Sequence, residues 1–447
     1  MVRTLKPWLE PTMNEKNAAT GICARRTLLL NAILEPESRI SLALTLVFSA
    51  ARKVLGSRMM TPMEMPKIDE VRNDGHLRVV IVERQLLHYR VSFYNRLRSL
   101  LLAEGIELQL LIGEGTPIEK KRKDEVPVPW ATPIDTRYFF GGMICWQPFR
   151  KYAQNADLVI VMHENKMIYN LWLTFFERPQ RIAFWGHGAN LQSPRPNGLK
   201  EKFKRWTVGK VDWWFAYTES SAKMVEDAGF PRARITVVEN SIDTAELTRD
   251  CANVTSEDCH LLRQRFGLGD GQIGLFIGSL YGEKRLPFLL SAACLIRMQI
   301  PDFQLLIVGA GPLQAEMEEA AQSCSWIHCL GPLRGKEKAV VLMLADIMLN
   351  PGLVGLGILD SFVSGRPMFT TDCGVHSPEI SYLSNWKNGV VTKMDQRIYA
   401  QAVSEVLRHP EMLDILRQGA LSSSSRYTIE NMASRIRDGI CSCLSLR

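Results

Sequence analysis

The sequence predicts an α/β protein with two domains, each built on a parallel β-sheet that carries helices on both faces. Three observations support this: continuous apolar runs bounded by charge, amphipathic segments between these runs, and a second start of the same alternation near Gly274. A run that is apolar at every position is typical of a strand buried on both faces. The order strand, helix, strand implies parallel pairing. A chain of 447 residues is long enough for two or three domains with their own cores.

The first domain is expected over residues 76–250. It opens with the apolar run LRVVIVE at 77–83, and an amphipathic helix follows that closes at Gly105. A second helix is expected over 219–230. The remaining buried strands of this domain are expected within 106–115, 157–164, 181–188, 212–220 and 234–243.

The second domain is expected over residues 270–430. A charged segment at 245–272, which contains the turn GLGDG, is expected to join the domains and to act as their hinge. Strands are expected within 274–281, 303–312, 326–333, 346–352 and 366–372, and helices within 286–299, 312–324 and 358–365. Residues 431–447 are expected to form a C-terminal helix or tail.

Residues 1–75 show no rhythm of strands and helices. We expect a disordered extension or a start codon that has been assigned too early, because Met59 and three further methionines stand just before the first strand. The uncharged run 40–51 is too short to span a bilayer. It also begins too far into the chain for a signal peptide.

Composition is that of an ordinary globular protein, with 46% hydrophobic and 23% charged residues. The formal net charge of +7 suits anionic partners but does not choose among nucleotides, phospholipids and nucleic acid. None of the 10 cysteines forms a C-x-x-C pair, and most stand in apolar stretches. We therefore expect reduced thiols, a cytoplasmic protein and no metal site.

Unusual residues gather where the strands of the second domain end, which is where open parallel sheets bind ligands. Lys284 and Arg285 follow the first strand and are candidates to neutralise a diphosphate leaving group; the alternative is a solvated basic turn. Gly309 and Gly311 follow the next strand and permit close approach of a ligand. A glycine-rich loop that contains Gly355 and Gly357 then leads into a short helix, and the free amides at the start of this helix favour a phosphate. Asp360 on that helix is a candidate to bind ribose hydroxyls.

In the first domain, His187 lies between two glycines at a strand end. It is a candidate to orient a substrate or to transfer a proton; the alternative is a turn histidine that bonds to the backbone. His88 and Arg90 stand in the loop after the first strand, where Arg90 could contact an anionic acceptor or form an ion pair. His163 and Glu164 are lesser candidates at the end of another strand.

The order of these elements resembles the retaining GT-B-fold glycosyltransferases of family GT4, also called glycosyl transferases group 1. The resemblance covers residues 77–391 and is carried by FIGSLYGEKRLPFLLSA, FQLLIVGAGP, GLGILDSFVSGRPMFTTD, HSPEI, HYRVSFYNRL, AFWGHG and AYTESSAKMVEDAGFPRARITVVENSID, with the Asn-Gly pair at 388–389. Each phrase is weak alone, but their shared order is specific.

The resemblance implies transfer of a sugar from a nucleotide-sugar donor with retention at the anomeric carbon and without a metal or other cofactor. It implies that Lys284 and Arg285 neutralise the diphosphate, that Asp360 holds the ribose and that His187 assists at the acceptor side. It also implies that Gly355 and Gly357 receive the diphosphate at the helix start. Glu379, in HSPEI, is expected to frame the donor pocket, through its backbone more than its side chain.

The chain departs from the family pattern at three positions, Gly352, Asp360 and Ser279. Of two glutamates separated by seven residues, the second corresponds to Asp360 and the first to Gly352, which has no side chain. The usual arginine after the strand glycine corresponds to Ser279, and Arg285 is expected to supply the missing cation. Lys284 matches the family's lysine, and the completeness of the remaining site favours a divergent enzyme over an inactive one. A silent nucleotide-sugar-binding subunit and a nucleotide-sugar epimerase remain the alternatives, whereas the pyridoxal lysine motif of a phosphorylase is missing.

Residues 195–214 are basic and aromatic, with six Lys or Arg against two acids. Such a segment could rest on an anionic bilayer surface beside a glycan or lipid-linked acceptor; the alternative is a solvated helix whose aromatic side chains reach the core. Together with this segment, the resemblance implies a role in surface polysaccharide or glycoconjugate synthesis, either in the cytoplasm or peripherally on the inner face of the membrane. Nucleic acid is not expected as a partner because no binding module is recognised.

Overall fold

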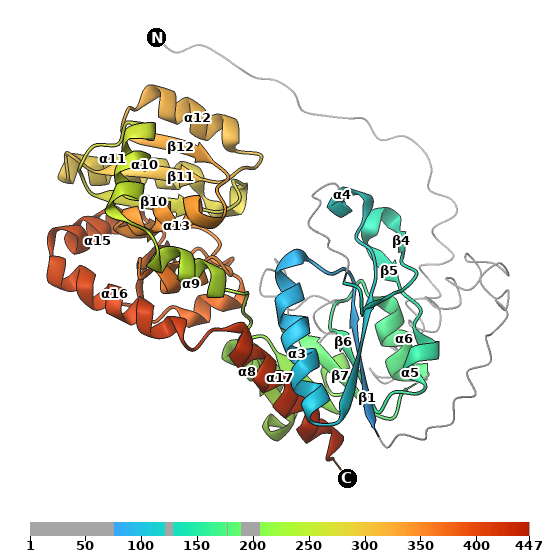
Figure 1. Cartoon of the computed structure of the whole chain (residues 1–447). Helices are drawn as coiled ribbons and strands as arrows, with labels where there is room; N and C mark the ends of the chain where they lie inside the picture. The colour runs from blue at the N-terminus through green and yellow to red at the C-terminus, as the bar shows by residue number, and fades with distance from the viewer. Residues whose placement is uncertain (1–75, 121–127, 177, 189–205, 447) are drawn as a thin grey trace, which may run out of the picture. The chain divides into compact units, whose positions relative to one another are not determined.

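The protein is described by a computed structural model that covers residues 76–120, 128–176, 178–188 and 206–446. It has the predicted α/β fold, with two parallel sheets flanked by helices (Figure 1). The expectations for residues 1–75, and for 195–205 of the basic segment, lie outside the described residues. No helix in the described ranges is long and apolar enough to cross a membrane.

The first sheet has seven parallel strands in the order β3-β2-β1-β6-β7-β8-β9. Its central strands, β1, β6 and β7, are the predicted apolar runs, and β6 and β7 are buried at every position. The strand bounds are β1 Leu77–Glu83, β2 Ile106–Ile112, β3 Thr132–Pro133, β6 Leu158–Met162, β7 Ile182–Gly186, β8 Trp213–Ala216 and β9 Ile235–Val237.

Helices cover both faces of this sheet. On one face α3 (Val91–Ala103) packs with alternate strand residues such as Val79 and Ile81. On the other face lie α5 (Arg150–Ala153), α6 (Ile168–Phe176) and α8 (Glu219–Asp227). Thr218 caps α8, because its side chain accepts a hydrogen bond from the amide of Ser221.

A short antiparallel pair was not predicted. It consists of β4 (Arg137–Phe139) and β5 (Ile144–Trp146), joined by a turn in which Phe140 and Gly141 have positive φ. A single-turn helix, α4 (Pro117–Lys120), precedes it.

The second sheet has six parallel strands in the order β12-β11-β10-β13-β14-β15. Their bounds are β10 Ile273–Ile277, β11 Gln304–Val308, β12 Ile327–Gly331, β13 Ile347–Leu349, β14 Met368–Thr371 and β15 Gly389–Thr392. One face packs with α11 (Leu286–Gln299), α12 (Gln314–Ser323) and α15 (Gln396–Arg408). The other packs with α13 (Gly335–Leu344) and α14 (Ile358–Ser364).

The segment expected as a joint, residues 245–272, is folded into the second domain. It forms α9 (Ala245–Ala252) and α10 (Ser256–Phe266), and Leu262 is buried in a core with Val341 of α13. A capping box at Thr255 starts α10, and Gly267 ends it in the left-handed conformation. Since this segment is packed, the connection between the domains is the shorter stretch 238–244.

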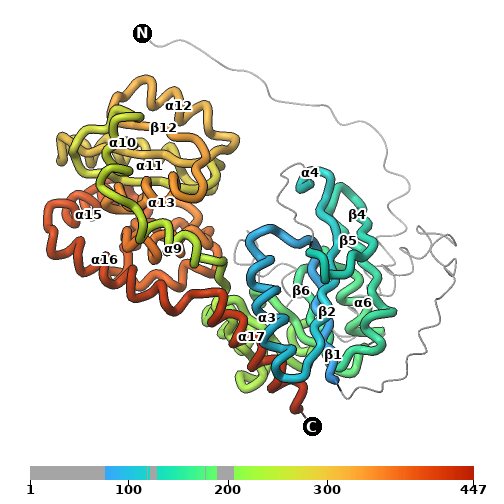
Figure 2. Tube along the Cα trace, in the orientation of Figure 1, coloured from blue at the N-terminus to red at the C-terminus, as the bar shows by residue number. Residues whose placement is uncertain are grey.

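The chain returns to the first domain at its end. After α16 (Pro410–Ser424), the last helix α17 (Ile429–Leu444) packs beside α3 and adds Met432, Ile436 and Ile440 to the first domain's core. Figure 2 shows this C-terminal segment alongside α3. The first domain is therefore built from two separate parts of the chain.

Candidate functional site

The loops that follow β10 and β11 pack against each other through their backbones. The amide of Leu313 donates a hydrogen bond to the carbonyl of Leu280, at 3.0 Å. A Cβ added to Gly309 would lie 1.8 Å from the carbonyl oxygen of Gly278, and one added to Gly311 would lie 2.4 Å from that of Leu280. The two glycines are therefore required by contact between the loops, whether or not a ligand approaches them.

The turn of residues 282–284 lies directly against the loop after β13. The amide of Leu353 donates to the carbonyl of Glu283 at 2.8 Å, and Nζ of Lys284 donates to the carbonyl of Leu353 at 2.6 Å. A Cβ at Gly352 would lie 2.2 Å from the carbonyl oxygen of Glu283. No side chain fits at position 352 in this arrangement, so the absence of the expected glutamate has a steric cause.

The two cations of this turn differ in environment. Lys284 is half-buried, and burial lowers its pKa to about 8. Arg285 has φ of +58°, a left-handed conformation that ends the turn and precedes α11. Ser279, in the loop just before, is exposed. Both cations therefore lie at the carboxyl edge of the second sheet, as predicted, although Lys284 is already bonded to a backbone carbonyl.

The glycines before α14 are less constrained than Gly352. A Cβ at Gly357 would meet no atom within 4 Å, and one at Gly355 would meet only the side chain of Ser377, whose Oγ would lie at 3.5 Å. The space in front of α14 is thus open. Asp360 is buried in the first turn of α14, where Nζ of Lys338 lies 2.7 Å from its Oδ1. Its carboxylate is paired with this lysine, a partner that the sequence did not suggest.

A histidine that the sequence reasoning did not assign organises the neighbouring loop. Nδ1 of His376 accepts a hydrogen bond from the amide of Val354 at 3.1 Å, and Nε2 lies 2.7 Å from the carbonyl oxygen of Thr371. Since a carbonyl can only accept, Nε2 carries the proton. The thiol of Cys373 lies 3.5 Å from Nε2. Burial would raise the pKa of this thiol, but interactions with His376, the amide of Val375 and Arg285 outweigh burial and lower it. This histidine ties the loop after β14 to the loop after β13.

Glu379 connects to the first domain. Its side chain is buried and accepts a hydrogen bond from Nδ2 of Asn240 at 2.7 Å. The hydroxyl of Tyr382 donates to the carbonyl of the same asparagine at 3.0 Å. Asn240 lies in the connection between the domains, so the carboxylate of Glu379 is engaged in holding that connection.

At the carboxyl edge of the first sheet, His187 and Arg90 lie close to the same ring. The ring of His187 is 4.3 Å from that of Tyr217, measured between centroids. The guanidinium carbon of Arg90 lies 5.9 Å from the centroid of Tyr217 and 5.5 Å from that of Trp185. The structure thus brings together two of the residues that the sequence proposed for the acceptor side.

The other acceptor-side candidates lie in different surroundings. His88 is exposed on the short turn after β1. His163 is 6% exposed, with its ring 4.7 Å from Phe184 and 4.8 Å from Trp214, and its Nε2 lies 2.9 Å from the hydroxyl of Thr207. Its position is that of a core histidine. A Cβ at Gly186 would lie 3.2 Å from its Cβ, which favours a glycine there.

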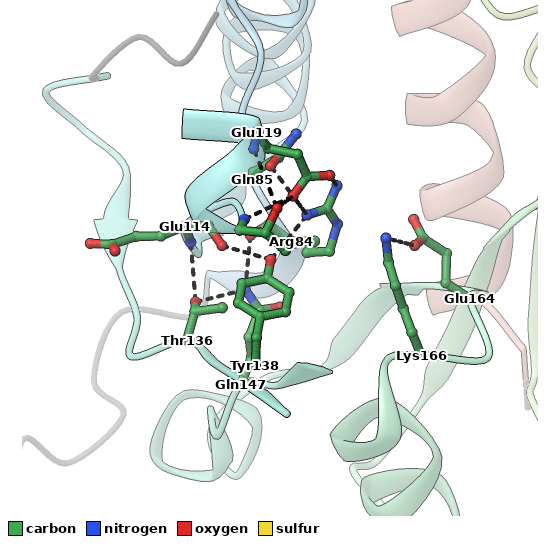
Figure 3. Close-up of polar contacts among 10 residues, drawn as sticks. Arg84, Gln85, Glu114, Glu119, Thr136, Tyr138, Gln147, Glu164 and Lys166 are labelled. Carbon is green, nitrogen blue, oxygen red and sulfur yellow. Dashed lines mark hydrogen bonds and ion pairs between the residues drawn. The ribbon is translucent and has the colours of Figure 1, made fainter. Parts of the chain in front are cut away.

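A polar cluster that the sequence did not predict surrounds Arg84, just after β1 (Figure 3). Its guanidinium forms two hydrogen bonds with Glu119 of α4, at 2.8 and 2.9 Å, and a third with the hydroxyl of Tyr138 at 2.9 Å. The side-chain amide of Gln147 donates to the carbonyl of Arg84 at 2.9 Å. The cluster attaches α4 and the β4–β5 pair to the end of β1. Nearby, Glu164 pairs with Lys166 at 3.3 Å.

The described part of the basic segment packs inward. The ring of Trp206 stacks on Phe175 of α6 at 5.1 Å, and Nζ of Lys210 lies 5.0 Å from the Trp206 centroid. Throughout the residues that the structure covers, no group of three or more His, Cys, Asp and Glu could hold a metal ion.

Comparison with known proteins gives two family models in sequence order. Residues 76–246 match a model described as Glycosyltransferase Family 4, and residues 271–409 match one described as Glycosyl transferases group 1. The chain is 29% identical over 154 residues to the D-rhamnosyltransferase WbpZ of Pseudomonas aeruginosa, covering 33% of this chain and 39% of that protein. It is 23% identical over 322 residues to the D-inositol 3-phosphate glycosyltransferase of Thermobispora bispora, covering 68% and 69%. The first three curated relatives are matched over only 39% to 47% of their length.

Solved structures agree on the fold. HepE of Anabaena in complex with UDP has a TM-score of 0.61 at 13% identity, with 82% of this chain and 100% of that chain covered. WaaG, described as a glycosyltransferase involved in lipopolysaccharide biosynthesis, has a TM-score of 0.53 at 14% identity, with 80% and 98% covered. Residues 76–246 and 271–409 are therefore similar to glycosyltransferase domains, and the described part of the chain has the GT-B fold.

Proposed function

We propose that this protein transfers a sugar from a nucleotide-sugar donor to an acceptor, with the donor bound at the carboxyl edge of the second sheet. The observation that carries the proposal is the contact between the 282–284 turn and the Gly352 loop, which holds Lys284 beside the open space before α14. A cation beside open space at the start of a helix suits a diphosphate leaving group. The solved relative HepE is described in complex with UDP and with UDP-glucose, which supports a donor of this class.

In this proposal, Lys284 and Arg285 neutralise the developing charge on the diphosphate, and Gly355 and Gly357 leave the helix start accessible to it. Asp360 would hold the ribose, provided that Lys338 leaves one of its oxygens accessible. His187 lies at the matching edge of the first sheet and assists on the acceptor side. Transfer proceeds with retention and without a metal.

We further propose that the acceptor is a glycan or a lipid-linked glycan and that residues 195–214 contact a membrane surface. The support is the basic, aromatic composition of this segment. The stacking of Trp206 on Phe175 restricts the proposed contact to the part of the segment before Trp206.

A second candidate, a subunit that binds a nucleotide sugar without turnover, is favoured by Gly352 and Ser279. The first cannot carry the family's glutamate, and the second lacks the family's positive charge. The two candidates differ in turnover but share donor binding, so binding must be measured first and transfer second.

The test is a thermal-shift panel of UDP-, GDP-, ADP- and dTDP-sugars with the wild-type chain and with the double variant Lys284→Ala/Arg285→Gly. Glycine at 285 keeps the left-handed backbone while it removes the charge. Lys387→Ala is the matched control, because Lys387 is an exposed cation at the opposite, amino end of β15. A ligand at about a hundred times its dissociation constant stabilises the folded state by about 2.7 kcal/mol.

We expect one nucleotide to raise the melting temperature of the wild type and of Lys387→Ala but not that of the double variant. Transfer to water or to an acceptor from that donor then identifies an enzyme, whereas binding without any turnover identifies the silent subunit. If no donor shifts a well-folded wild-type sample, or if the double variant shifts equally, the proposed donor site is wrong.

A further inference from the structure

Two arginines follow β1, and their guanidinium groups differ in hydrogen-bond partners. Arg84 is bonded to side chains: Glu119, Tyr138 and Gln85 accept hydrogen bonds from its guanidinium (Figure 3). Arg90, six positions later, donates no side-chain hydrogen bond and forms no ion pair within the described residues, and its Nη1 is buried without a partner. One guanidinium is thus a structural cross-link, whereas the other keeps its donors free.

Aromatic rings hold the free guanidinium in place. The guanidinium carbon of Arg90 lies 5.5 Å from the centroid of Trp185 and 5.9 Å from those of Tyr89 and Tyr217. Such contacts stabilise the cation through the ring faces. They use none of the five N–H groups, which lie in the guanidinium plane. The side chain is therefore fixed in position with its hydrogen-bonding capacity unused.

The carboxylate of Glu83 does not fill this capacity. Glu83, the last residue of β1, interacts electrostatically with Arg90 but lies outside ion-pair distance, and it accepts a hydrogen bond from the hydroxyl of Tyr94 instead. Burial raises the pKa of Glu83, and the charge of Arg90 opposes this shift. A buried guanidinium without a paired anion is costly, because each unsatisfied donor loses its hydration without compensation.

A second donor at the same place is also without a partner. The indole Nε1 of Trp185, whose ring contacts Arg90, is buried and makes no hydrogen bond with any described residue. Trp185 lies at the end of β7, directly before the loop that carries His187. Two buried donors without a hydrogen-bond partner at one edge of the sheet point to a group that accepts hydrogen bonds and carries negative charge.

We propose that Arg90 binds an oxyanion that the acceptor carries, either a phosphate or a carboxylate. The inference rests on the proposed sugar transfer, in which the acceptor lies at this edge of the first sheet. A planar guanidinium binds both anions in bidentate fashion, which would fill the buried Nη1. His187, which shares the Tyr217 ring with Arg90, then faces the sugar hydroxyl that receives the donor.

The test separates this anion site from the donor site. Inorganic phosphate and methyl glucuronide are titrated at low ionic strength into the full chain carrying Lys284→Ala/Arg285→Gly, so that the donor cations cannot bind them. Arg90→Gln is then added in the same background. Arg96→Gln is the matched control, because Arg96 is an exposed arginine on α3 whose side chain makes no hydrogen bond or ion pair with the described residues.

We expect Arg90→Gln to weaken binding of one or both anions at least about 10-fold, as for the loss of hydrogen bonds to a charged group, and Arg96→Gln to leave it unchanged. Phosphate binding alone indicates a phosphorylated acceptor such as a lipid-linked one, and glucuronide binding alone indicates an acidic sugar. Melting curves check that each variant is folded. If Arg90→Gln does not fold, Arg90→Lys keeps the charge but loses the bidentate geometry, and its affinity should also fall.

Equal affinity in the Arg90 and Arg96 variants, or no binding of either anion by the folded parent, overturns the proposal. The donor panel distinguishes an effect on the acceptor side from an effect on donor binding. In a chain with an intact donor site, Arg90→Gln should leave the donor-induced shift in melting temperature unchanged while it raises the KM for the acceptor. Loss of the donor shift in Arg90→Gln would count against an acceptor-side role.

Discussion

At the scale of single residues, the structure explains why the chain departs at position 352 from the glycosyltransferase pattern that it resembles. The carbonyl oxygen of Glu283 occupies the place of a side chain there, at 2.2 Å from an added Cβ. The close approach also allows Lys284 to reach the carbonyl of Leu353. The missing glutamate and the position of the lysine are therefore two consequences of one backbone contact.

We predict that Gly352→Ala lowers the free energy of unfolding by about 1–3 kcal/mol, because the added methyl group must displace the 282–284 turn. The variant should also lose affinity for the donor, since the displaced turn carries Lys284. Thermal or urea unfolding measures the first effect, and the donor panel measures the second.

Gly357→Ala is the matched control for this prediction. It lies in the same loop, and its added Cβ would meet no atom within 4 Å. Its effect on unfolding should stay within about 0.5 kcal/mol. If both variants unfold like the wild type, the turn and the loop are not in rigid contact.

At the scale of secondary-structure elements, α4 and the β4–β5 pair depend on Arg84. The elements are four and three residues long, too short to be stable alone. Burial alone would raise the pKa of Glu119, but hydrogen bonds from Arg84 and Thr116 outweigh it and lower that pKa to about 2. The ion pair therefore stabilises the folded state whenever Glu119 is ionised.

We predict that Glu119→Gln lowers the free energy of unfolding at pH 7 by about 1–2 kcal/mol, after allowance for partial solvent screening. The pKa is lowered in the folded state, so the stabilisation is complete above pH 4.5 and is lost as the pH falls toward 2. The difference between wild type and variant should shrink over that range. Urea unfolding at several pH values measures it.

Glu114→Gln is the control, because Glu114 pairs with Lys120 in an exposed position where an ion pair contributes little. A constant difference between wild type and Glu119→Gln from pH 7 down to pH 2.5 would contradict the role of the ion pair.

These elements also mark the limit of what the sequence could predict. The strands of both sheets were predictable because a parallel strand buried on both faces is a continuous apolar run, as in Leu158–Met162. The β4–β5 pair has three residues in each strand and no such pattern. At the site, the sequence located the cations and glycines by their position after strands. It could not reveal the partner of Asp360 or the contact at Gly352, because both depend on residues that only the fold brings near.

At the scale of the whole molecule, the first domain is completed by the last helix of the chain. Met432, Ile436 and Ile440 of α17 are at most 1% exposed and share a core with Phe93 and other residues of α3. The intervening chain forms the second domain. The chain therefore passes between the domains twice, through residues 238–244 and again just before α17.

A polar cluster lies where the chain passes back from the second domain to the first. Glu239 has a positive φ of 52° and pairs with Arg435 of α17 at 2.7 Å and with Arg426, while the ring of Tyr427 stacks on Tyr382 at 3.9 Å. The two passages of the chain are thus linked to each other and, through Tyr382, to the second domain.

From this arrangement we predict that the first domain does not fold without α17. Ile436→Ala should lower its free energy of unfolding by about 2–5 kcal/mol, as for a fully buried side chain. Ile415→Ala is the control, because Ile415 of α16 is 62% exposed, and it should have little effect.

A chain that ends at residue 428 should lose the first domain, whereas the second domain should keep its own unfolding transition because its cores contain no residue of α17. Limited proteolysis should then cleave between residues 76 and 237 but spare 245–424. A truncated chain whose first domain resists protease as the wild type does would show that α17 covers a core already stable without it.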